Sequence, residues 1–449
     1  MKTNSKPFCF IMALLSLGTC ATAQTLTTLV NFNGGDGANP QAGLVVSGGT
    51  LYGTTYAGGS SGAGTVFSVN INGNDFTNLY NFNGATYDTN TGTYVPADGA
   101  NPAGGLLLSG NMLYGTTSAG GSSNAGTVFA INTNGGGYAI LYNFSGGSDG
   151  ADPEAGLVLS GNTLYGTTFL GGTANAGAVF RVNTNGAAFT NIYSFNGGAI
   201  GANPEAALVL SGNTLYGTTS AGGSSGSGTV FRVNTNGRSP GNVYSFTGGS
   251  DGANPEAGLL LSGSTLYGTA VNGGNSGWGT VFKVNTNGGG FSSYPFNWSD
   301  GANPQAGLLL LGNTLYGTAV NGGGPGWGTV FQVNTNGGGF TNLYPFTDGS
   351  DGANPEAGLV LLGNMLYGTT QADDPYGYGT VFALSVPGVA PTLYIALQGG
   401  QVVLSWSSPA FSLQASTNVA GVYTNVPGAT SPCTNAITGA QQFFRLQEN

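Results

Sequence analysis

Aromatic and acidic side chains recur in this sequence where they could hold a sugar. The residue before a repeated G-[TA]-V-F motif is Trp or Tyr in the last three of seven copies, and Ala or Ser in the first four. A D-G-A-N-P turn precedes each of those three copies and supplies an Asp. Aromatic rings pack against apolar faces of sugars, and carboxylates accept hydrogen bonds from sugar hydroxyls. We therefore predict a polysaccharide-binding site. Its six residues are Trp278, Trp327, Tyr378, Asp251, Asp300 and Asp351.

The same residue types also have interpretations that need no ligand. The turn Asp is present in six of the seven copies, so each Asp can cap its own turn through hydrogen bonds to the backbone. Carboxylate oxygens also suit Ca²⁺, but the spacing matches no EF-hand loop, and we predict no metal site. The aromatic residues can instead fill gaps between neighbouring sheets. Paired carboxylates can hydrolyse glycosides, yet structure better explains a recurring Asp, so no catalytic residue is predicted.

Composition excludes several kinds of chemistry. Histidine is absent from all 449 residues, which removes His-based triads, His metal ligands and His acid–base catalysis. The chain has 7 basic and 17 acidic residues and a net charge of −10. No basic patch can neutralise phosphates, so we do not expect a nucleic-acid partner. No cofactor is predicted.

Internal repeats define the elements that must position these residues. The tetrapeptide L-Y-G-T occurs seven times, starting at Leu51, Leu113, Leu164, Leu215, Leu266, Leu315 and Leu366. Residues 156–159, 163–167, 178–182 and 189–195 of one copy are expected strands, and Gly/Asn turns of the kind found in tight hairpins separate most of them. Each copy is thus a four-stranded antiparallel unit, and seven copies predict an all-β, seven-bladed β-propeller.

The two ends of the repeat array are offset by one strand. Residues 26–32 carry the motif of an outer strand before any inner strand appears, and the seventh inner set, 358–386, has no outer strand after it. The N-terminal strand should therefore complete the last blade and close the ring, which removes the open sheet edges. An open array is the alternative.

Strand direction assigns the connections to two opposite faces. The short S-G-N and N-T-N-G hairpins should share one face, and the longer Gly/Ser loops and D-G-A-N-P turns the other. Because binding sites usually lie on variable loops of a rigid scaffold, we expect the site on the second face.

A charge pattern also repeats. Glutamates precede basic residues by 27 positions in three copies, and we expect carboxylates to neutralise these bases; recent duplication is the alternative. The pairs are Glu154 with Arg181, Glu205 with Arg232, and Glu256 with Lys283.

The pattern LYGTT…GG…G-x-GTVF…NTNG…LYxF…DGANPxAGL, over residues 26–386, resembles the GloVer tandem repeat of exported bacterial proteins. The resemblance implies an exported repeat array joined to a C-terminal anchoring module. It implies no defined biochemical role.

The sequence predicts three segments. Residues 1–23 have a basic start, a short apolar stretch and an A-x-A site, as in a secretory signal peptide, with a lipoprotein signal at Cys20 as the rival. Residues 24–387 form the propeller, and 388–449 a small fibronectin- or immunoglobulin-like β-domain. No later segment is apolar enough to span a membrane. We therefore expect a secreted or cell-surface protein.

These observations favour an exported, non-enzymatic binding module with a polysaccharide or surface partner. The alternatives are a structural surface or matrix protein without a small ligand, and a carboxylate-based polysaccharide-active enzyme.

Overall fold

A computed structural model describes most of the chain, and its described part contains strands and turns but no helix. The predicted signal peptide lies outside the described residues. These are 24–84, 86–88, 93–95, 97–373, 377–386, 393–398, 401–406, 411–418, 421–429, 431, 433–436 and 442–448. Contacts divide the chain into two compact units, one comprising 27–360 and 367–382, the other 1–26, 361–366 and 383–449.

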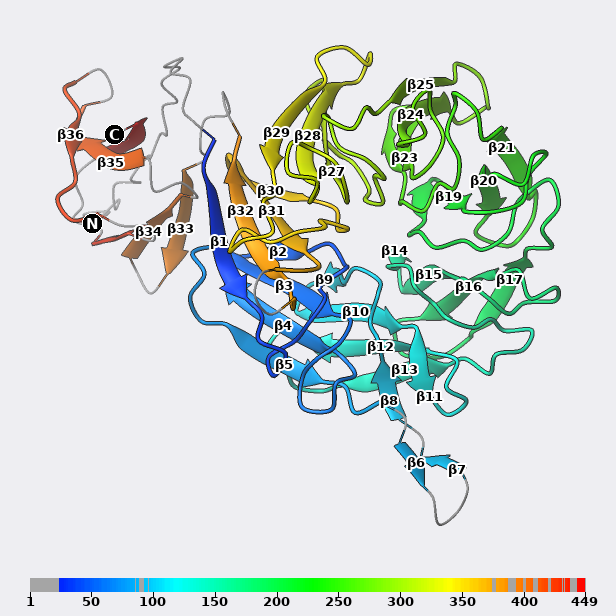
Figure 1. The fold of residues 1–449 in the computed structure, drawn as a ribbon. Coiled ribbons are helices and arrows are strands. Elements are labelled where there is room, and N and C mark those ends of the chain that lie inside the picture. The colour runs from blue at the N-terminus through cyan, green and yellow to red at the C-terminus, as the bar shows by residue number, and fades with distance from the viewer. Residues whose placement is uncertain are drawn as a thin grey trace, which may run out of the picture. The chain divides into compact units, whose positions relative to one another are not determined.

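The repeats form four-stranded sheets that follow one another in chain order (Figure 1). One sheet contains β14 (Val158–Ser160), β15 (Thr163–Thr168), β16 (Ala178–Asn183) and β17 (Thr190–Ser194), with antiparallel neighbours. Among the described residues, seven sheets have four strands.

Two sheets precede the sheet of β14–β17 in the chain: β2 (Val45–Ser47), β3 (Thr50–Thr55), β4 (Thr65–Asn70) and β5 (Thr77–Asn81); then β9 (Leu107–Ser109), β10 (Met112–Thr117), β12 (Thr127–Asn132) and β13 (Ala139–Asn143). Three sheets follow it: β18 (Val209–Ser211), β19 (Thr214–Thr219), β20 (Thr229–Asn234) and β21 (Gly241–Ser245); β22 (Leu260–Ser262), β23 (Thr265–Ala270), β24 (Thr280–Asn285) and β25 (Ser292–Pro295); and β26 (Leu309–Leu311), β27 (Thr314–Ala319), β28 (Thr329–Asn334) and β29 (Thr341–Pro345). The remaining sheet combines β30 (Val360–Leu362), β31 (Met365–Thr370) and β32 (Thr380–Ser385) with β1 (Leu26–Asn31) from the start of the chain. Two short pairs join β6 (Thr86–Asp88) to β7 (Thr93–Val95) and β8 (Ala97–Ala100) to β11 (Ala119–Gly121).

The core lies between successive sheets. One cluster joins Val128 and Phe144 of one sheet to Leu164 and Phe180 of the next. The glycine of L-Y-G-T makes this packing possible, because a Cβ on Gly166 would lie 2.6 Å from the ring of Phe180. A larger residue there would displace the buried phenylalanine.

Hydrogen bonds between sheets account for the Asn of the D-G-A-N-P turn. Asn203 has a φ of 57°, in the left-handed region that Asn tolerates better than most residues. Its backbone N–H donates to the carbonyl of Ala176 at 2.8 Å, and its side-chain amide donates to Phe169 at 3.2 Å. Each turn therefore ties its own repeat to the preceding sheet.

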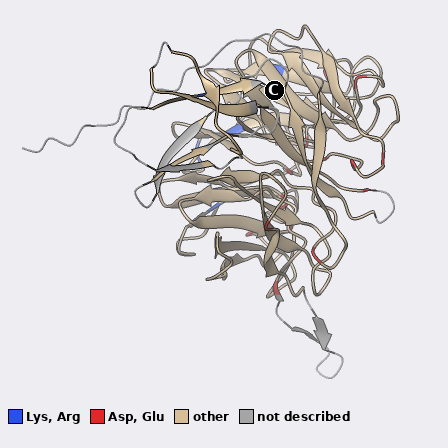
Figure 2. Cartoon of the chain, turned by 90° about the vertical axis from the view of Figure 1, so that its left-hand side faces the viewer, with Lys and Arg blue, Asp and Glu red and all other residues tan. Residues whose placement is uncertain are grey.

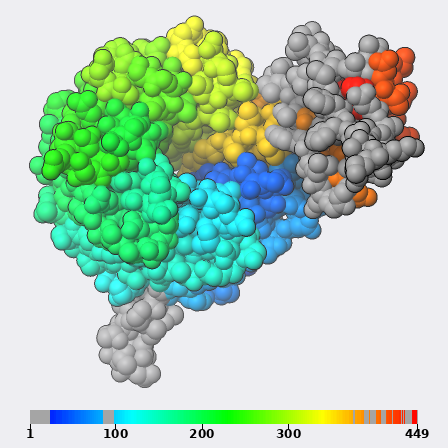
Figure 3. All heavy atoms as spheres, turned by 180° about the vertical axis from the view of Figure 1, so that it is seen from behind, coloured from blue at the N-terminus to red at the C-terminus, as the bar shows by residue number. Residues whose placement is uncertain are grey.

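The first and last repeats are joined by the same contacts as neighbouring repeats. Strand β1 lies beside β32. The N–H of Asn39 donates to the carbonyl of Tyr378 at 2.8 Å, and the hydroxyl of Thr369 donates to Pro40 at 3.1 Å. Figure 3 shows the repeats succeeding one another around a common centre in chain order.

Connections gather on two faces of the repeat unit. On the hairpin face, the N–H of Thr184 donates to Asn162 at 2.9 Å and so links the two short hairpins of one sheet. On the loop face, an antiparallel bridge joins Ala151 of a D-G-A-[ND]-P turn to Leu170 of the longer loop. Within the repeat unit, Figure 2 shows Lys and Arg toward one side and Asp and Glu toward the centre and the other side.

The C-terminal part of the other unit contains two three-stranded sheets. One is β33 (Tyr394–Gln398), β34 (Gln401–Ser405) and β37 (Cys433–Ala436), and the other is β36 (Thr424–Asn425), β35 (Phe411–Ser416) and β38 (Phe443–Glu448). Leu404, Trp406 and Leu413 are buried in their shared core, and Cys433 is a free, half-buried thiol.

Candidate functional site

The turn aspartates are bound by their own turns. Asp251 is 8% exposed and accepts hydrogen bonds from the Tyr244 hydroxyl at 3.0 Å, the Thr247 N–H at 2.8 Å and the Thr247 hydroxyl. Asp351 accepts the equivalent bonds from Tyr344 and Thr347. Two of the six predicted ligand-binding residues are thus already hydrogen-bonded within their own turns. Burial, and then the Asp351 carboxylate, raise the pKa of Tyr344 to about 12.

Asp300 lies in a different turn. Its segment runs Phe296-Asn297-Trp298-Ser299-Asp300, one residue shorter than 246–251, and a Trp stands where that turn has glycine. The N–H of Asp300 donates to the side-chain oxygen of Asn297 at 3.2 Å. Partial burial raises the pKa of Asp300, and hydrogen bonds from Asn297 oppose the rise.

Three tryptophans form an exposed group, called here the tryptophan strip: Trp278, Trp298 and Trp327. Their exposed fractions are 37%, 44% and 42%. The ring centroids of Trp278 and Trp298 are 4.8 Å apart, at an interplanar angle of 60°. Trp298 also reaches the loop that carries Trp327, because its Cζ2 lies 3.8 Å from where a Cβ of Gly326 would stand. The strip therefore crosses two consecutive sheets.

Backbone contacts hold the strip in place while its rings face solvent. The carbonyls of Trp278 and Trp327 accept hydrogen bonds from Asn303 and Asn354, each at 2.9 Å. The carbonyl of Trp298 accepts one from Gly323 at 2.8 Å. The backbone of each tryptophan is thus held at the seam between neighbouring segments.

Tyr378 is anchored beyond the strip. Its N–H donates to the carboxylate of Asp373 at 2.7 Å, and its ring lies against Gly34, where a Cβ would approach Cζ to 3.0 Å. Asp373 is buried and also accepts from the N–H of Gly379. The side chain of Tyr378 is therefore half-buried against the N-terminal segment.

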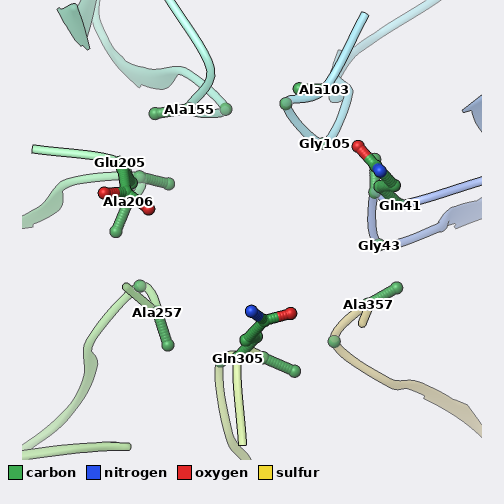
Figure 4. A pocket seen from close by; sticks show the side chains of 18 of the residues that line it. Gln41, Gly43, Ala103, Gly105, Ala155, Glu205, Ala206, Ala257, Gln305 and Ala357 are labelled. Carbon is green, nitrogen blue, oxygen red and sulfur yellow. The ribbon is translucent and has the colours of Figure 1, made fainter. Parts of the chain in front are cut away.

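A second feature is a cavity of about 160 Å³ surrounded by one segment from each of the seven repeats (Figure 4). Four glutamates and two glutamines line it: Glu154, Glu205, Glu256, Glu356, Gln41 and Gln305. The amide of Gln305 donates to Glu256 at 3.3 Å.

Burial is the main cause of the raised pKa values of these glutamates. It raises the pKa of Glu154, Glu256 and Glu356 to about 7. Repulsion from Glu205 adds to the rise at Glu154 and Glu256. The pKa of Glu205 is also raised by burial, against a hydrogen bond with Ser220.

The expected neutralisation of the basic residues by these glutamates is wrong. The charges that act on Glu154 and Glu256 are other carboxylates. Lys283 instead donates from Nζ to the carbonyl of Thr335 at 3.0 Å, in the hairpin of the next sheet. The reason is geometric: the glutamates precede the innermost strand, whereas the bases lie on the third strand near the hairpin face.

The described residues contain neither a metal-binding cluster nor a membrane-spanning helix. No group of three or more Asp, Glu or Cys there is arranged to hold a metal ion. The same residues include no helix long and apolar enough to cross a membrane.

One family model matches the chain in three overlapping stretches, at residues 17–161, 93–273 and 243–425, and describes the Gloeobacter/Verrucomicrobia repeat. The chain belongs to this family. The resemblance based on the L-Y-G-T pattern is thereby confirmed. No curated protein sequence matches this Gloeobacter/Verrucomicrobia repeat chain.

Two solved structures match the repeat chain at low sequence identity. A nidogen/laminin complex is 14% identical, with 62% of this chain and 89% of that chain covered and a TM-score of 0.38. A puromycin-hydrolysing peptidase of Mycobacterium tuberculosis is 12% identical, with 97% and 69% covered and a TM-score of 0.49. Neither likeness supports an inference about function.

The repeat pattern itself explains why Trp298 was missed. Trp278 and Trp327 occupy equivalent positions in two Gloeobacter/Verrucomicrobia repeats, so alignment of the copies finds them. Trp298 lies in a five-residue turn like that of the first copy, where Gly34 stands in its place, so alignment of the copies finds no second aromatic residue there. Its signal was a large aromatic residue at a turn position where most other copies have Gly.

Proposed function

We propose that this protein binds polysaccharide through the tryptophan strip. The observation that carries the proposal is that three of the chain's four tryptophans are exposed together, whereas Trp406 is buried. An exposed cluster of large apolar side chains usually marks a binding surface. Each ring can cover about 150–250 Å² of ligand when fully buried, with little entropy lost because the indole has few rotatable bonds.

The surroundings of the strip suit sugar hydroxyls. Asn297 and Ser299 flank Trp298, and both are exposed. Amides and hydroxyls both donate and accept hydrogen bonds, as sugar hydroxyls do. The frame is rigid, because inter-sheet hydrogen bonds hold the backbones that carry the rings. The tryptophan rings are therefore available for stacking on a backbone that is already held in place.

We further propose that the scaffold is a closed propeller and that the protein is exported. A seven-bladed propeller, closed by β1 in the last sheet, would hold the strip on its loop face. The contacts of Asn39 with Tyr378 and of Thr369 with Pro40 support closure, because they repeat those between neighbouring sheets. The signal-like residues 1–23 support export, and the chain then acts as a secreted or cell-surface binding module.

Native affinity electrophoresis tests the binding. The mature chain is run through gels that contain neutral polysaccharides, and retention is compared with a triple variant Trp278→Ala, Trp298→Ala, Trp327→Ala. We expect the parent to be retarded and the variant to lose at least about tenfold in affinity, which corresponds to about 1.4 kcal/mol. Its melting temperature should change little, because exposed side chains contribute little to folding stability.

A matched control changes another exposed apolar residue. Val422 is 86% exposed in the other unit, so Val422→Ala should be retained like the parent. Equal retention of the parent and the triple variant would reject the strip as the site. If no polysaccharide retards the parent, the result would favour the alternative of a structural surface or matrix protein without a small ligand. Release of new reducing ends from a retained polysaccharide would instead indicate an enzyme.

A further inference from the structure

Trp278 and Lys283 lie toward opposite ends of one segment. Trp278 stands two residues before β24, and Lys283 is the fourth residue within that strand. Five residues of strand span about 16 Å. Lys283 also donates to Thr335 on the hairpin face, which holds its ammonium group away from the loop face.

The other basic residues of the repeat unit share this placement. Arg181 and Arg232 occupy the same strand position as Lys283 in two preceding sheets, and Arg238 lies in a hairpin between β20 and β21. Arg181, Arg232 and Lys283 each lie past the middle of their strand, toward the hairpin face. Among the described residues of the repeat unit, the loop face therefore carries no basic side chain.

An acidic side chain, by contrast, accompanies the strip. Asp300 follows Trp298 by two residues and is only half-buried. Asp348 is half-buried in the turn after β29, in the sheet of Trp327, whereas Asp351 of that turn is buried and bonded to its own turn. A ligand on the strip would thus meet negative charge and find no guanidinium or ammonium group with which to pair.

We infer that the tryptophan strip selects uncharged polysaccharides and rejects anionic ones, an inference that rests on the proposed function. Stacking on indole rings needs no ligand charge. A carboxylated or sulfated chain brings like charges toward Asp300 and its neighbours without a compensating cation, and like charges repel at separations within the screening length. Added salt weakens that repulsion and leaves stacking largely unchanged.

The test uses two derivatives of one backbone. The neutral polysaccharide that best retards the protein is carboxymethylated in one sample and hydroxyethylated to the same degree in another. At about 20 mM salt we expect the hydroxyethyl form to retard the protein and the carboxymethyl form to fail. At about 0.5 M salt, where the screening length falls below about 5 Å, the carboxymethyl form should regain retention. A purely steric effect of substitution would not respond to salt.

A charge variant locates the effect. Asp300→Asn removes one carboxylate beside Trp298, and affinity for the carboxymethyl form should rise about twofold at low salt, the size expected for one exposed charge several ångströms away. Asp75 is exposed in the hairpin between β4 and β5, so Asp75→Asn changes the net charge equally on the other face and should have no effect.

The outcomes separate this inference from the proposed function. Retention of the carboxymethyl form equal to that of the hydroxyethyl form at low salt would overturn the charge selection and leave polysaccharide binding intact. A failure of every neutral polysaccharide would overturn the proposed function, and this inference with it.

Discussion

At the residue scale, each turn aspartate acts first on its own turn. In the fourth repeat Ile200 replaces the Asp and packs against the core of that interface. The aspartate is therefore one of two solutions to the same structural requirement: a hydrogen-bonded cap or an apolar contact. This interchange explains why a residue present in most copies need not contact a ligand.

Replacing one such carboxylate should weaken the fold. Asp251→Ala leaves the Tyr244 hydroxyl and the Thr247 N–H without their acceptor, and we expect a loss of about 2 kcal/mol in the free energy of unfolding. Asp251→Ile should cost less, because it copies the fourth repeat. Urea unfolding measures both. Stability of Asp251→Ala within about 0.5 kcal/mol of the parent would contradict the role of the cap.

At the element scale, the sheets depend on glycines that leave room for buried rings. Gly166 faces Phe180, and Leu157 lies 2.8 Å from the same Cβ position. Both neighbours are buried, so neither can move into solvent. The conserved spacing of L-Y-G-T and G-[TA]-V-F within the chain thus reflects packing across β15 and β16.

Adding one methyl group at that position should strain the core. We expect Gly166→Ala to lower the free energy of unfolding by about 1–3 kcal/mol. Phe180→Leu in the same chain should recover part of the loss, since it shortens the opposing side chain. Gly324→Ala is the matched control, because no atom lies within 4 Å of its Cβ position. Thermal unfolding that is unchanged in Gly166→Ala would reject the packing argument.

At the scale of the whole molecule, the seven segments bring glutamates together around one cavity. No single repeat contains more than one of these side chains, so their mutual repulsion is a property of the assembled sheets. Gln41 and Gln305 occupy the same position in two repeats and carry no charge.

The raised pKa values of these glutamates predict a dependence of stability on pH. Because the folded pKa values of Glu154, Glu256 and Glu356 are about 7, above the ordinary 4.5, the folded state favours the protonated forms. Their contribution is present below about pH 4.5 and is lost as the pH rises through about 7. We expect the melting temperature to fall between pH 5 and pH 8.

A glutamine variant tests the source of this dependence. The triple change Glu154→Gln, Glu256→Gln, Glu356→Gln should flatten the profile and raise stability at about pH 8. An unchanged slope in the variant would place the titrating groups elsewhere.

Sequence alone was sufficient for the local structure and the family. Glycine and asparagine at fixed spacings dictate where the hairpins turn, because those positions need left-handed backbone. The strands between them follow from the repeated apolar pattern, and the family match confirms the repeat. Trp278 and Trp327 could be found because they break the symmetry of aligned copies.

Tertiary structure decided which side chains meet. Glu256 faces Gln305 of the next repeat, 49 residues along the chain, and not Lys283. Trp298 joins Trp278 from a turn position where the equivalent first turn has Gly34, so the repeat pattern does not predict the contact. The physical reason is that periodicity fixes contacts within one sheet, whereas contacts between sheets depend on how successive sheets pack, which no single repeat encodes.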